Sequence, residues 1–409
     1  MIQDGLEVKR LDLRVMVATV SLVIGCAGPA RSAPPTVLPE AAPAVVPPPS
    51  AGSLETRLRK SSKLAPILDQ APTYRFQVLV SVPAPDGSGW LEREGFRVDA
   101  EYFYPASAMK LCTAVAALEA LADLREAKGS DLDVGAMLLT DSASKRRGGA
   151  TSVSNLVLGS LVVSDNDASN DLFDLVGFDG LHERMWRMGL SSVRVRHRLG
   201  AATGDPRLTP RITLASPGSE PIVIPAREGR VTLEKNDQPG VLVGESHISS
   251  GGRIVDEPMS FEEKNRISLA DLQELLIGVM RPELRPSGAP RFGAQERSVL
   301  ASALTAFPSA RGAGVDREHK PFLEGIERVV PRTSLTLASK SGRAYGFLVE
   351  NAYVHDARSG RSFFLTAAIY ANANGRLNDD LYEYGSIAFP VFAELGEVVA
   401  RTVLDAPAM

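Results

Sequence analysis

The chain has few cysteines, no excess of charge of one sign and no long hydrophobic run. It holds two cysteines in 409 residues, so a disulfide scaffold is not expected and the core alone has to hold the fold. The 45 basic residues face 49 acidic ones, which argues against a nucleic-acid partner. The five histidines show no His-x-His or His-x-x-x-His spacing, so neither a metal nor another cofactor is implied. A Gly-x-Ser-x-Gly elbow is also missing, which argues against an α/β-hydrolase.

The N-terminus has the pattern of an export signal. Basic residues at 9–14 precede an apolar run over 15–24, which is too short to be a permanent membrane span and leads to Cys26. The segment Val23-Ile24-Gly25-Cys26 resembles a bacterial lipobox. That resemblance implies that residues 1–26 are a lipoprotein signal peptide and that Cys26 carries the lipid. A plain secretory signal and an uncleaved anchor remain as alternatives.

Residues 27–53 are rich in proline and alanine and almost free of charge, which predicts an extended linker to a folded domain over 54–409. We expect the protein to be exported to the bacterial cell envelope, where a lipid anchor holds it to the membrane facing the periplasm. We also expect a monomer. Ala27 stands where an aspartate often retains such proteins in the inner membrane, and this favours the outer membrane. Cys112 then has no partner and is expected to be a buried, unpaired side chain.

The stretch over residues 104–124 carries the first candidate for chemistry. Pro105 precedes Ser107, and the residues that follow are nearly all apolar, which predicts a buried helix beginning near Ser107. Lys110 lies one turn further on the same face. An amine in apolar surroundings has a lowered pKa and can act as a base, while a helix N-terminus can stabilise an oxyanion. These are the parts of an acyl-transfer site, although Ser-x-x-Lys recurs at Ser142 and is weak alone.

Two further polar motifs interrupt apolar segments. Ser164-Asp165-Asn166 separates two helical stretches and is either a polar elbow facing a cleft or an ordinary helix cap. Lys340-Ser341-Gly342 ends the first of three strand-like segments, at 335–338, 346–354 and 362–370.

Periodicity predicts the remaining elements. Helices are expected over 54–72, 181–189, 268–280 and 388–404, and strands over 75–82, 90–98 and, as a basic alternating run, 193–200. Residues 200–262 are rich in glycine and proline and predict an inserted, partly β excursion. Strands at both ends that enclose a helical middle indicate an α+β fold. We expect an antiparallel β-sheet flanked by terminal helices, with an all-helical lobe at about 106–325.

The ordered motifs at 107–110, 164–166 and 340–342 resemble those of the penicillin-recognising serine hydrolases. Within that group the chain is most similar to class A β-lactamase-like proteins, over roughly residues 60–405. Tyr-Pro-Ala-Ser and Ser-Asp-Asn-Asp-Ala are also similar to segments of serine hydrolases of bacterial lipoprotein type. Each motif is weak alone, whereas the ordered trio is specific. The resemblance implies a β-lactamase/transpeptidase-like fold.

The resemblance implies a role for each motif residue. Ser107 would attack a lactam or peptide carbonyl, and Lys110 would take its proton. Ser164 would relay a proton toward the leaving nitrogen, while Lys340 would bind the substrate carboxylate and help keep Lys110 neutral. Substrate contacts are implied for Asn166, Ser341, Gly342 and Arg343, with the N–H groups of Ser107 and Arg343 as the oxyanion hole.

One departure from the family concerns deacylation. Class A lactamases carry a glutamate on a loop after the Ser-Asp-Asn helices, and that glutamate activates the deacylating water. Residues 198–202 fall at this place and include no carboxylate. Glu245 or Glu257, in the insertion, would have to fold back to replace it, and each is otherwise a surface residue.

Three functions therefore remain open. The first is a β-lactamase-like serine acyl-hydrolase that hydrolyses a β-lactam or a related amide. The second is a D,D-peptidase or penicillin-binding amidohydrolase that acts on peptidoglycan peptides. The third is a non-catalytic lipoprotein that binds envelope peptides.

Overall fold

The computed structural model describes residues 53–84, 89–128, 131–140, 150–200, 204–312 and 314–405. The predicted signal peptide with Cys26, and the linker as far as residue 52, lie outside these ranges. In the described ranges, no helix combines the length and apolar character that a membrane span requires. The same ranges hold no cluster of three or more His, Cys, Asp or Glu side chains suited to a metal ion.

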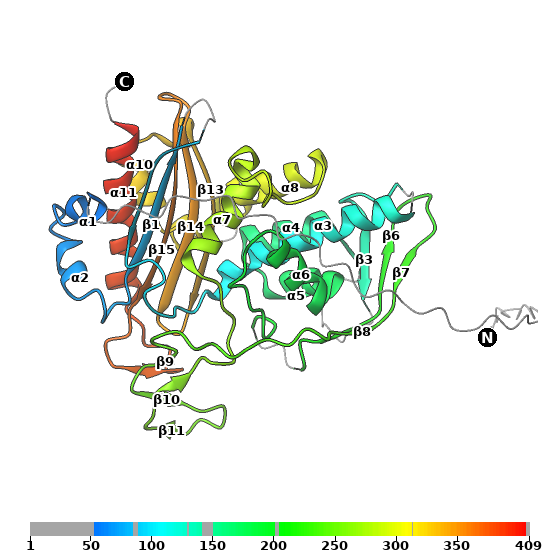
Figure 1. Ribbon diagram of the computed structural model, residues 1–409, viewed down its shortest axis with the longest axis horizontal. Coiled ribbons are helices and arrows are strands. Elements are labelled where there is room, and N and C mark those ends of the chain that lie inside the picture. The colour runs from blue at the N-terminus through cyan, green and yellow to red at the C-terminus, as the bar shows by residue number, and fades with distance from the viewer. Residues whose placement is uncertain are drawn as a thin grey trace, which may run out of the picture. The chain divides into compact units, whose positions relative to one another are not determined.

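A five-stranded antiparallel sheet organises the domain (Figure 1). Its order is β13-β14-β15-β1-β2, so the N-terminal hairpin extends the C-terminal meander and β13 forms one edge. In this register Val80 pairs with Leu365, and Lys340 pairs with Asn351. The strands are β1 (Gln77–Pro83), β2 (Trp90–Phe96), β13 (Leu335–Ala344), β14 (Phe347–Asp356) and β15 (Arg361–Tyr370).

Helices from both ends of the domain cover one face of this sheet (Figure 1). They are α1 (Ser53–Leu58), α2 (Ala65–Asp69), α10 (Leu323–Glu327) and α11 (Phe389–Leu404). The single helix predicted over 54–72 is in fact the two short helices α1 and α2. Pro66 stands in the first turn of α2, where its missing N–H is harmless, but it would break a helix that continued through it.

The other face of the sheet packs against α7 and the helical lobe. The short 3₁₀ turn η1 (Ala106–Met109) leads into α3, whose residues are buried from Lys110 to Leu121, as expected for a central helix. Ser268 caps α7 by accepting a hydrogen bond from the Asp271 N–H. The lobe helices are α3 (Lys110–Lys128), α4 (Val153–Val162), α5 (Asn166–Val176), α6 (Phe178–Arg187), α7 (Leu269–Met280), α8 (Ala294–Thr305) and α9 (Asp316–His319).

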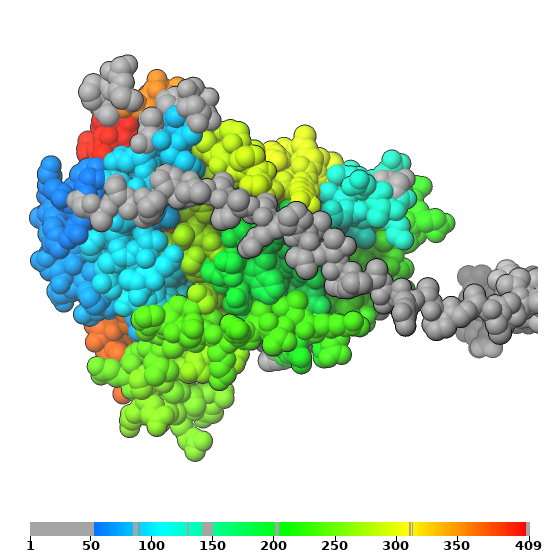
Figure 2. Space-filling model, in the orientation of Figure 1, coloured from blue at the N-terminus to red at the C-terminus, as the bar shows by residue number. Residues whose placement is uncertain are grey.

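The lobe also carries a small sheet that the sequence did not reveal. Its strands are β3 (Met137–Thr140), β4 (Thr151–Ser152), β6 (Ile212–Ala215) and β7 (Ile222–Ile224), in the order β4-β3-β6-β7. The insertion therefore adds strands to the lobe, and in the space-filling view its residues spread over the lower part of the visible face (Figure 2).

The remaining insertion strands pair in short ladders. They are β5 (Leu208–Thr209), β8 (Arg227–Glu228), β9 (Leu242–Val243), β10 (Ser246–Ile248), β11 (Ile254–Val255) and β12 (Met259–Ser260), with β16 (Arg376–Leu377) pairing parallel to β10. The strand predicted over 193–200 is wrong, because within that segment only Arg194 makes a β-bridge, with Arg266. The rest of the segment is held instead by side chains of the lobe.

Candidate active site

Ser107 lies in the turn η1, at the junction between the lobe and the edge strand β13. The residue before it, Ala106, has a φ of +45°, a conformation that costs energy for a residue other than glycine. The Ser107 side chain is half-buried, and its hydroxyl has no hydrogen-bond partner among the described residues. A strained turn thus presents an unengaged hydroxyl at the head of the central helix.

Gly342 allows β13 to approach this turn closely. A Cβ atom at position 342 would lie 2.2 Å from the Pro105 carbonyl oxygen and 2.8 Å from the Ser107 nitrogen. Both are backbone atoms, which cannot swing aside as a side chain can. Only glycine fits here, and the close contact fixes the distance between the strand and the candidate nucleophile.

Lys110 follows Ser107 by one turn and is completely buried. Its ammonium donates to the carbonyl oxygen of Ser164 and, at 3.1 Å, to the Ser164 hydroxyl. Burial lowers the pKa of Lys110 to about 7, because the charged form loses hydration, and the nearby Asp165 opposes this only in part. A large share of the amine is therefore neutral near pH 7 and able to accept a proton.

Lys340 reaches the same hydroxyl from the other side. Its amine lies 3.2 Å from the Ser164 Oγ and 2.9 Å from the Ser341 carbonyl oxygen. Burial holds the pKa of Lys340 well below its usual range, and the charge of Lys110 lowers it further. The Ser164 hydroxyl thus lies between two buried amines, an arrangement that can carry a proton from one amine to the other.

Ser164 stands on a sharp elbow between α4 and α5. Its φ is +58°, and the next residue, Asp165, caps α5 by accepting a hydrogen bond of 3.1 Å from the Ala168 N–H. The motif is therefore a helix cap through Asp165, while the Ser164 hydroxyl contacts the amines of Lys110 and Lys340. Asn166 is exposed at the first position of α5.

Residues 198–200, which belong to the segment predicted to correspond to the glutamate loop of class A lactamases, are fixed to α5. The Asn170 side chain donates to the Leu199 carbonyl and accepts from the Leu199 N–H, each at 3.0 Å. Arg198 forms an ion pair with Asp174, with Nε 3.1 Å from Oδ1. A Cβ atom on Gly200 would lie 2.7 Å from Asn166 Nδ2, so this segment also abuts the Ser-Asp-Asn elbow. A leucine therefore stands at the anchored position, while residues 201–203 lie outside the described ranges.

Neither candidate replacement for the glutamate reaches the site. Glu245 and Glu257 are exposed, and within the described residues neither carboxylate has a hydrogen bond or ion pair with the groove. The reason is local pairing. The Glu245 N–H donates to the Gly375 carbonyl at 2.7 Å, and the Glu257 carbonyl interacts with the His247 ring at 2.9 Å, so both residues are held in the hairpins of the insertion.

The remaining predicted contacts lie along β13. The Ser341 hydroxyl donates to the His319 carbonyl at 2.8 Å and so ties the strand to α9. The Arg343 guanidinium is partly exposed, 3.7 Å from Glu318 and over the Tyr384 ring. The sequence analysis missed His319, whose lowered pKa reflects first its burial and then the charge of Lys340. No spacing in the sequence could have indicated it.

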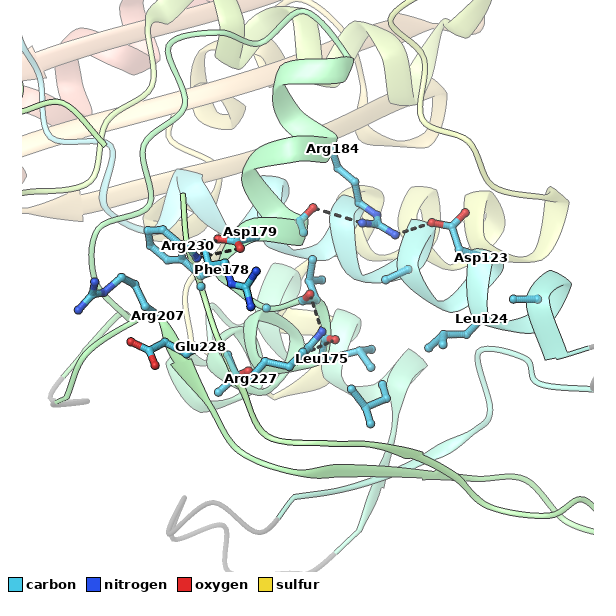
Figure 3. Close-up of a pocket in the computed structure, with 18 residues that line it drawn as sticks. Asp123, Leu124, Leu175, Phe178, Asp179, Arg184, Arg207, Arg227, Glu228 and Arg230 are labelled. Atoms are coloured by element: carbon cyan, nitrogen blue, oxygen red, sulfur yellow. Dashed lines mark hydrogen bonds and ion pairs between the residues drawn. The ribbon is translucent and has the colours of Figure 1, made fainter. Parts of the chain in front are cut away.

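A separate cleft of about 630 Å³ lies on the lobe, between α3, the α5–α6 junction and the insertion (Figure 3). Its lining excludes Ser107, and two of its guanidinium groups make contacts that hold the lobe together. Arg184 pairs with Asp123, while Arg227 donates to the carbonyl groups that end α5, at 3.0 Å for Val176. Here Arg227 satisfies the free carbonyls of a helix end and anchors the insertion to the lobe.

Comparison with known proteins agrees with this geometry. The model of the beta-lactamase enzyme family matches residues 92–218, a range that includes the Ser-x-x-Lys and Ser-Asp-Asn motifs. Over this range the chain is similar to the beta-lactamase enzyme family. Comparison of the sequence with curated proteins gave no significant match.

Solved structures of beta-lactamases are similar to this chain in fold. A beta-lactamase from Desulfarculus baarsii superposes with a TM-score of 0.50 over 87% of this chain and 98% of its own, at 17% identity. A beta lactamase from Burkholderia vietnamiensis gives 0.51 over 86% and 97%, at 14% identity. The α+β fold predicted from the sequence is thus confirmed, and it is similar to the fold of these beta-lactamases.

Proposed function

We propose that this protein is a cell-envelope acyl-hydrolase in which Ser107 forms an acyl-enzyme with a β-lactam or a related amide. The observation that carries the proposal is the Ser164 hydroxyl, which lies 3.1 Å from one buried amine and 3.2 Å from another beside the turn of Ser107. A nucleophile with a neutral amine and a relay hydroxyl beside it is what acyl transfer requires.

In the proposed acylation step, the Ser107 oxygen attacks the substrate carbonyl carbon while Lys110 takes the hydroxyl proton. The N–H groups of Ser107 and Arg343 would stabilise the resulting oxyanion, at about 10²–10³ in rate per donor. The carbon–nitrogen bond then breaks, and the leaving nitrogen takes a proton that Ser164 relays from Lys110. Lys340 would hold the substrate carboxylate, and Asn166 would bind the amide side chain.

In this proposed cycle, hydrolysis of the acyl-enzyme is expected to be slower than its formation. Within the segment that corresponds to the family's general-base loop, the residue anchored by Asn170 is Leu199, whose side chain can neither accept a proton nor orient water. Loss of such a base typically costs about 10²–10⁴ in rate. This favours a second candidate, a penicillin-binding D,D-peptidase on peptidoglycan peptides, in which the lactam adduct lasts. An anchor on Cys26 would hold either enzyme, as a monomer, at the periplasmic side of the membrane.

Ser107→Ala is expected to abolish covalent labelling. The purified domain, incubated with benzylpenicillin and followed by intact-protein mass spectrometry, should gain one adduct on Ser107, and the alanine variant none. A transient adduct would support lactam hydrolysis, and a lasting adduct with release of D-alanine from a peptide would support the peptidase. A wild-type protein without any adduct, or a Ser107→Ala variant that keeps the cellular phenotype, would favour a non-catalytic peptide binder.

Leu199→Glu is expected to shorten the lifetime of the adduct at least tenfold, a gain below the ~10²–10⁴ that a well-positioned base provides. The substitution places a carboxylate on backbone that Asn170 already fixes. Chasing the adduct after removal of free lactam gives its half-life, and Leu208→Glu, on an exposed strand, is the matched control. Equal half-lives in all three proteins would mean that residue 199 does not face the acyl group.

A further inference from the structure

Two buried charges lie behind the strand that carries Lys340, and the proposed mechanism uses neither. Lys320, in the connection between α9 and α10, is 3% exposed, and Glu350, on β14, is 0% exposed. Burying either charge alone is costly, so a chain retains such groups in its core only where their surroundings compensate them. Their contacts therefore show what they hold in place.

The Lys320 ammonium is bound to the strand from behind. It donates to the Leu304 carbonyl at 2.8 Å, the Leu337 carbonyl at 3.1 Å and the Ser339 hydroxyl at 3.4 Å. Leu337 and Ser339 belong to β13 and precede Lys340 directly along the strand. All three ammonium hydrogens thus have acceptors, and two of those acceptors belong to the catalytic strand.

Glu350 holds the neighbouring strand to the same connection. One carboxylate oxygen accepts the Phe322 N–H at 2.7 Å, and the other is buried without a partner among the described residues. Glu350 pairs with Ser341 in the β13–β14 register, and side chains of paired residues share a face of the sheet. Since Ser341 also binds the His319 carbonyl, residues 319–322 contact β13 and β14 at several points.

The two faces of β13 therefore have separate tasks. Successive side chains of a strand point to opposite faces, so Lys340 faces Ser164 while Ser339 and Ser341 face the buried pair. Resting on the proposed function, we propose that Lys320 and Glu350 are positioning residues that hold Lys340 from behind the strand and set the charge on its amine.

The groups around Lys340 determine the direction in which its pKa is shifted. On one face of β13, the Lys340 amine lies near Lys110 and the Ser164 hydroxyl, and His319 of α9 interacts with its charge. From the other face, the charges of Lys320 and Glu350 act on it. Burial comes first in lowering the pKa of Lys340, Lys110 and Lys320 lower it further, and Glu350 raises it. Burial likewise lowers the pKa of Lys320 and raises that of Glu350, while each partner's charge opposes the shift of the other.

Removing the charge of Glu350 and removing the charge of Lys320 should shift the pKa of Lys340 in opposite directions. In Glu350→Gln, the attraction that raises the pKa of Lys340 is lost, so this pKa falls by roughly one pH unit, the order expected for one nearby charge at an effective dielectric of about 20. In Lys320→Met, one repelling charge is lost and that pKa rises by a similar amount. A purely structural role would disturb the site in the same direction in both variants, and the double variant should lie near the wild type.

The test is an NMR titration of protein labelled with ¹³C at the lysine Cε, with the Lys340 signal assigned by its loss in Lys340→Arg. The matched control is Glu324→Gln, in α10 close to Lys320 in sequence, because Glu324 is exposed and forms an ion pair with Arg328. Opposite shifts in the two single variants support the proposal. Lys340 pKa shifts of the same sign in the two variants overturn the proposal. If Lys320→Met fails to fold, the absence of a shift in a folded Glu350→Gln still overturns it.

The same variants, acylated with benzylpenicillin across pH 5.5–10, separate this proposal from the proposed function. Lys340 has to be charged to bind the carboxylate. The pH above which acylation is lost should therefore follow the pKa of Lys340 measured by NMR, and be lower in Glu350→Gln and higher in Lys320→Met than in the wild type. Acylation limits that stay fixed while the Lys340 signal shifts would overturn the positioning role. A wild type that never acylates, with opposite NMR shifts intact, would reject the proposed function and leave the charge coupling standing.

Discussion

Gly342→Ala is expected to slow acylation of Ser107 by about 10²-fold or more, the cost of displacing reacting groups by about 1 Å. The added methyl group would lie 2.2 Å from the Pro105 oxygen, 2.7 Å from the Ala108 nitrogen and 2.8 Å from the Ser107 nitrogen. Because all three are backbone atoms of the turn that carries the nucleophile, either β13 or the turn has to move. Both movements separate Ser107 from the strand that holds Lys340.

The rate of adduct formation with benzylpenicillin, measured with circular dichroism as a check of folding, tests this expectation. Gly385→Ala is the matched control, since a Cβ atom there meets no heavy atom within 4 Å and the residue has no positive φ. A folded Gly342→Ala protein that acylates at the wild-type rate would show that close approach of β13 is not needed for the reaction.

The three motifs could be predicted because each depends on short spacing. Ser107 and Lys110 share a helix face by periodicity, and Ser164-Asp165-Asn166 marks a break between helices whatever the tertiary structure. The C-terminal strands follow from alternation and turns, and a helix apolar on all sides has to lie in the core. Local chemistry thus placed the three motifs on the elements where the structure has them.

The remaining site contacts depend on backbone atoms distant in sequence. The anchor between Asn170 and Leu199 joins residues 29 apart through main-chain groups, which leave no mark in the side-chain pattern. One signal was available, because Asn170 lies four residues after Asn166 on the same helix. Glu350 offered another, as a lone carboxylate inside a strand expected to be buried.

The fold differs from expectation where short elements depend on tertiary partners. The strands β3 and β4 are short and pair with each other, and β3 gains a further partner in β6 from the insertion. Conversely, the alternating run over 193–200 finds no neighbouring strand beyond one bridge and is held by Asn170 and Asn265 side chains. Alternation alone does not make a strand when no edge is available.

Lys110→Met is expected to abolish acylation and at the same time to stabilise the fold. Without the base, the rate should fall by about 10²–10⁴, as when other positioned bases are lost. The stability gain follows from the pKa of the buried amine, which burial lowers from 10.5 to about 7. Buried methionine fills a similar volume without a charge to desolvate.

The size of this stabilisation depends on pH. Between the folded pKa of Lys110, about 7, and the ordinary value, 10.5, the unfolded chain binds the proton and the folded one does not. Wild-type stability therefore rises with pH across this window, and the cost of the lysine is largest at and below its folded pKa. At about 1.4 kcal/mol per unit of pKa shift, this cost is roughly 4–5 kcal/mol, less the hydrogen bonds to Ser164 that methionine gives up.

Urea unfolding of both proteins at pH 6 and pH 9.5 measures this difference. Lys110→Met should exceed the wild type in free energy of unfolding by roughly 2–4 kcal/mol at pH 6, with a smaller margin at pH 9.5. Lys63→Met, at an exposed lysine paired with Glu394, is the control and should show no such pH dependence. A margin that is the same at both pH values would mean that Lys110 keeps its proton in the folded protein, and the proposed general base would then have to be sought elsewhere.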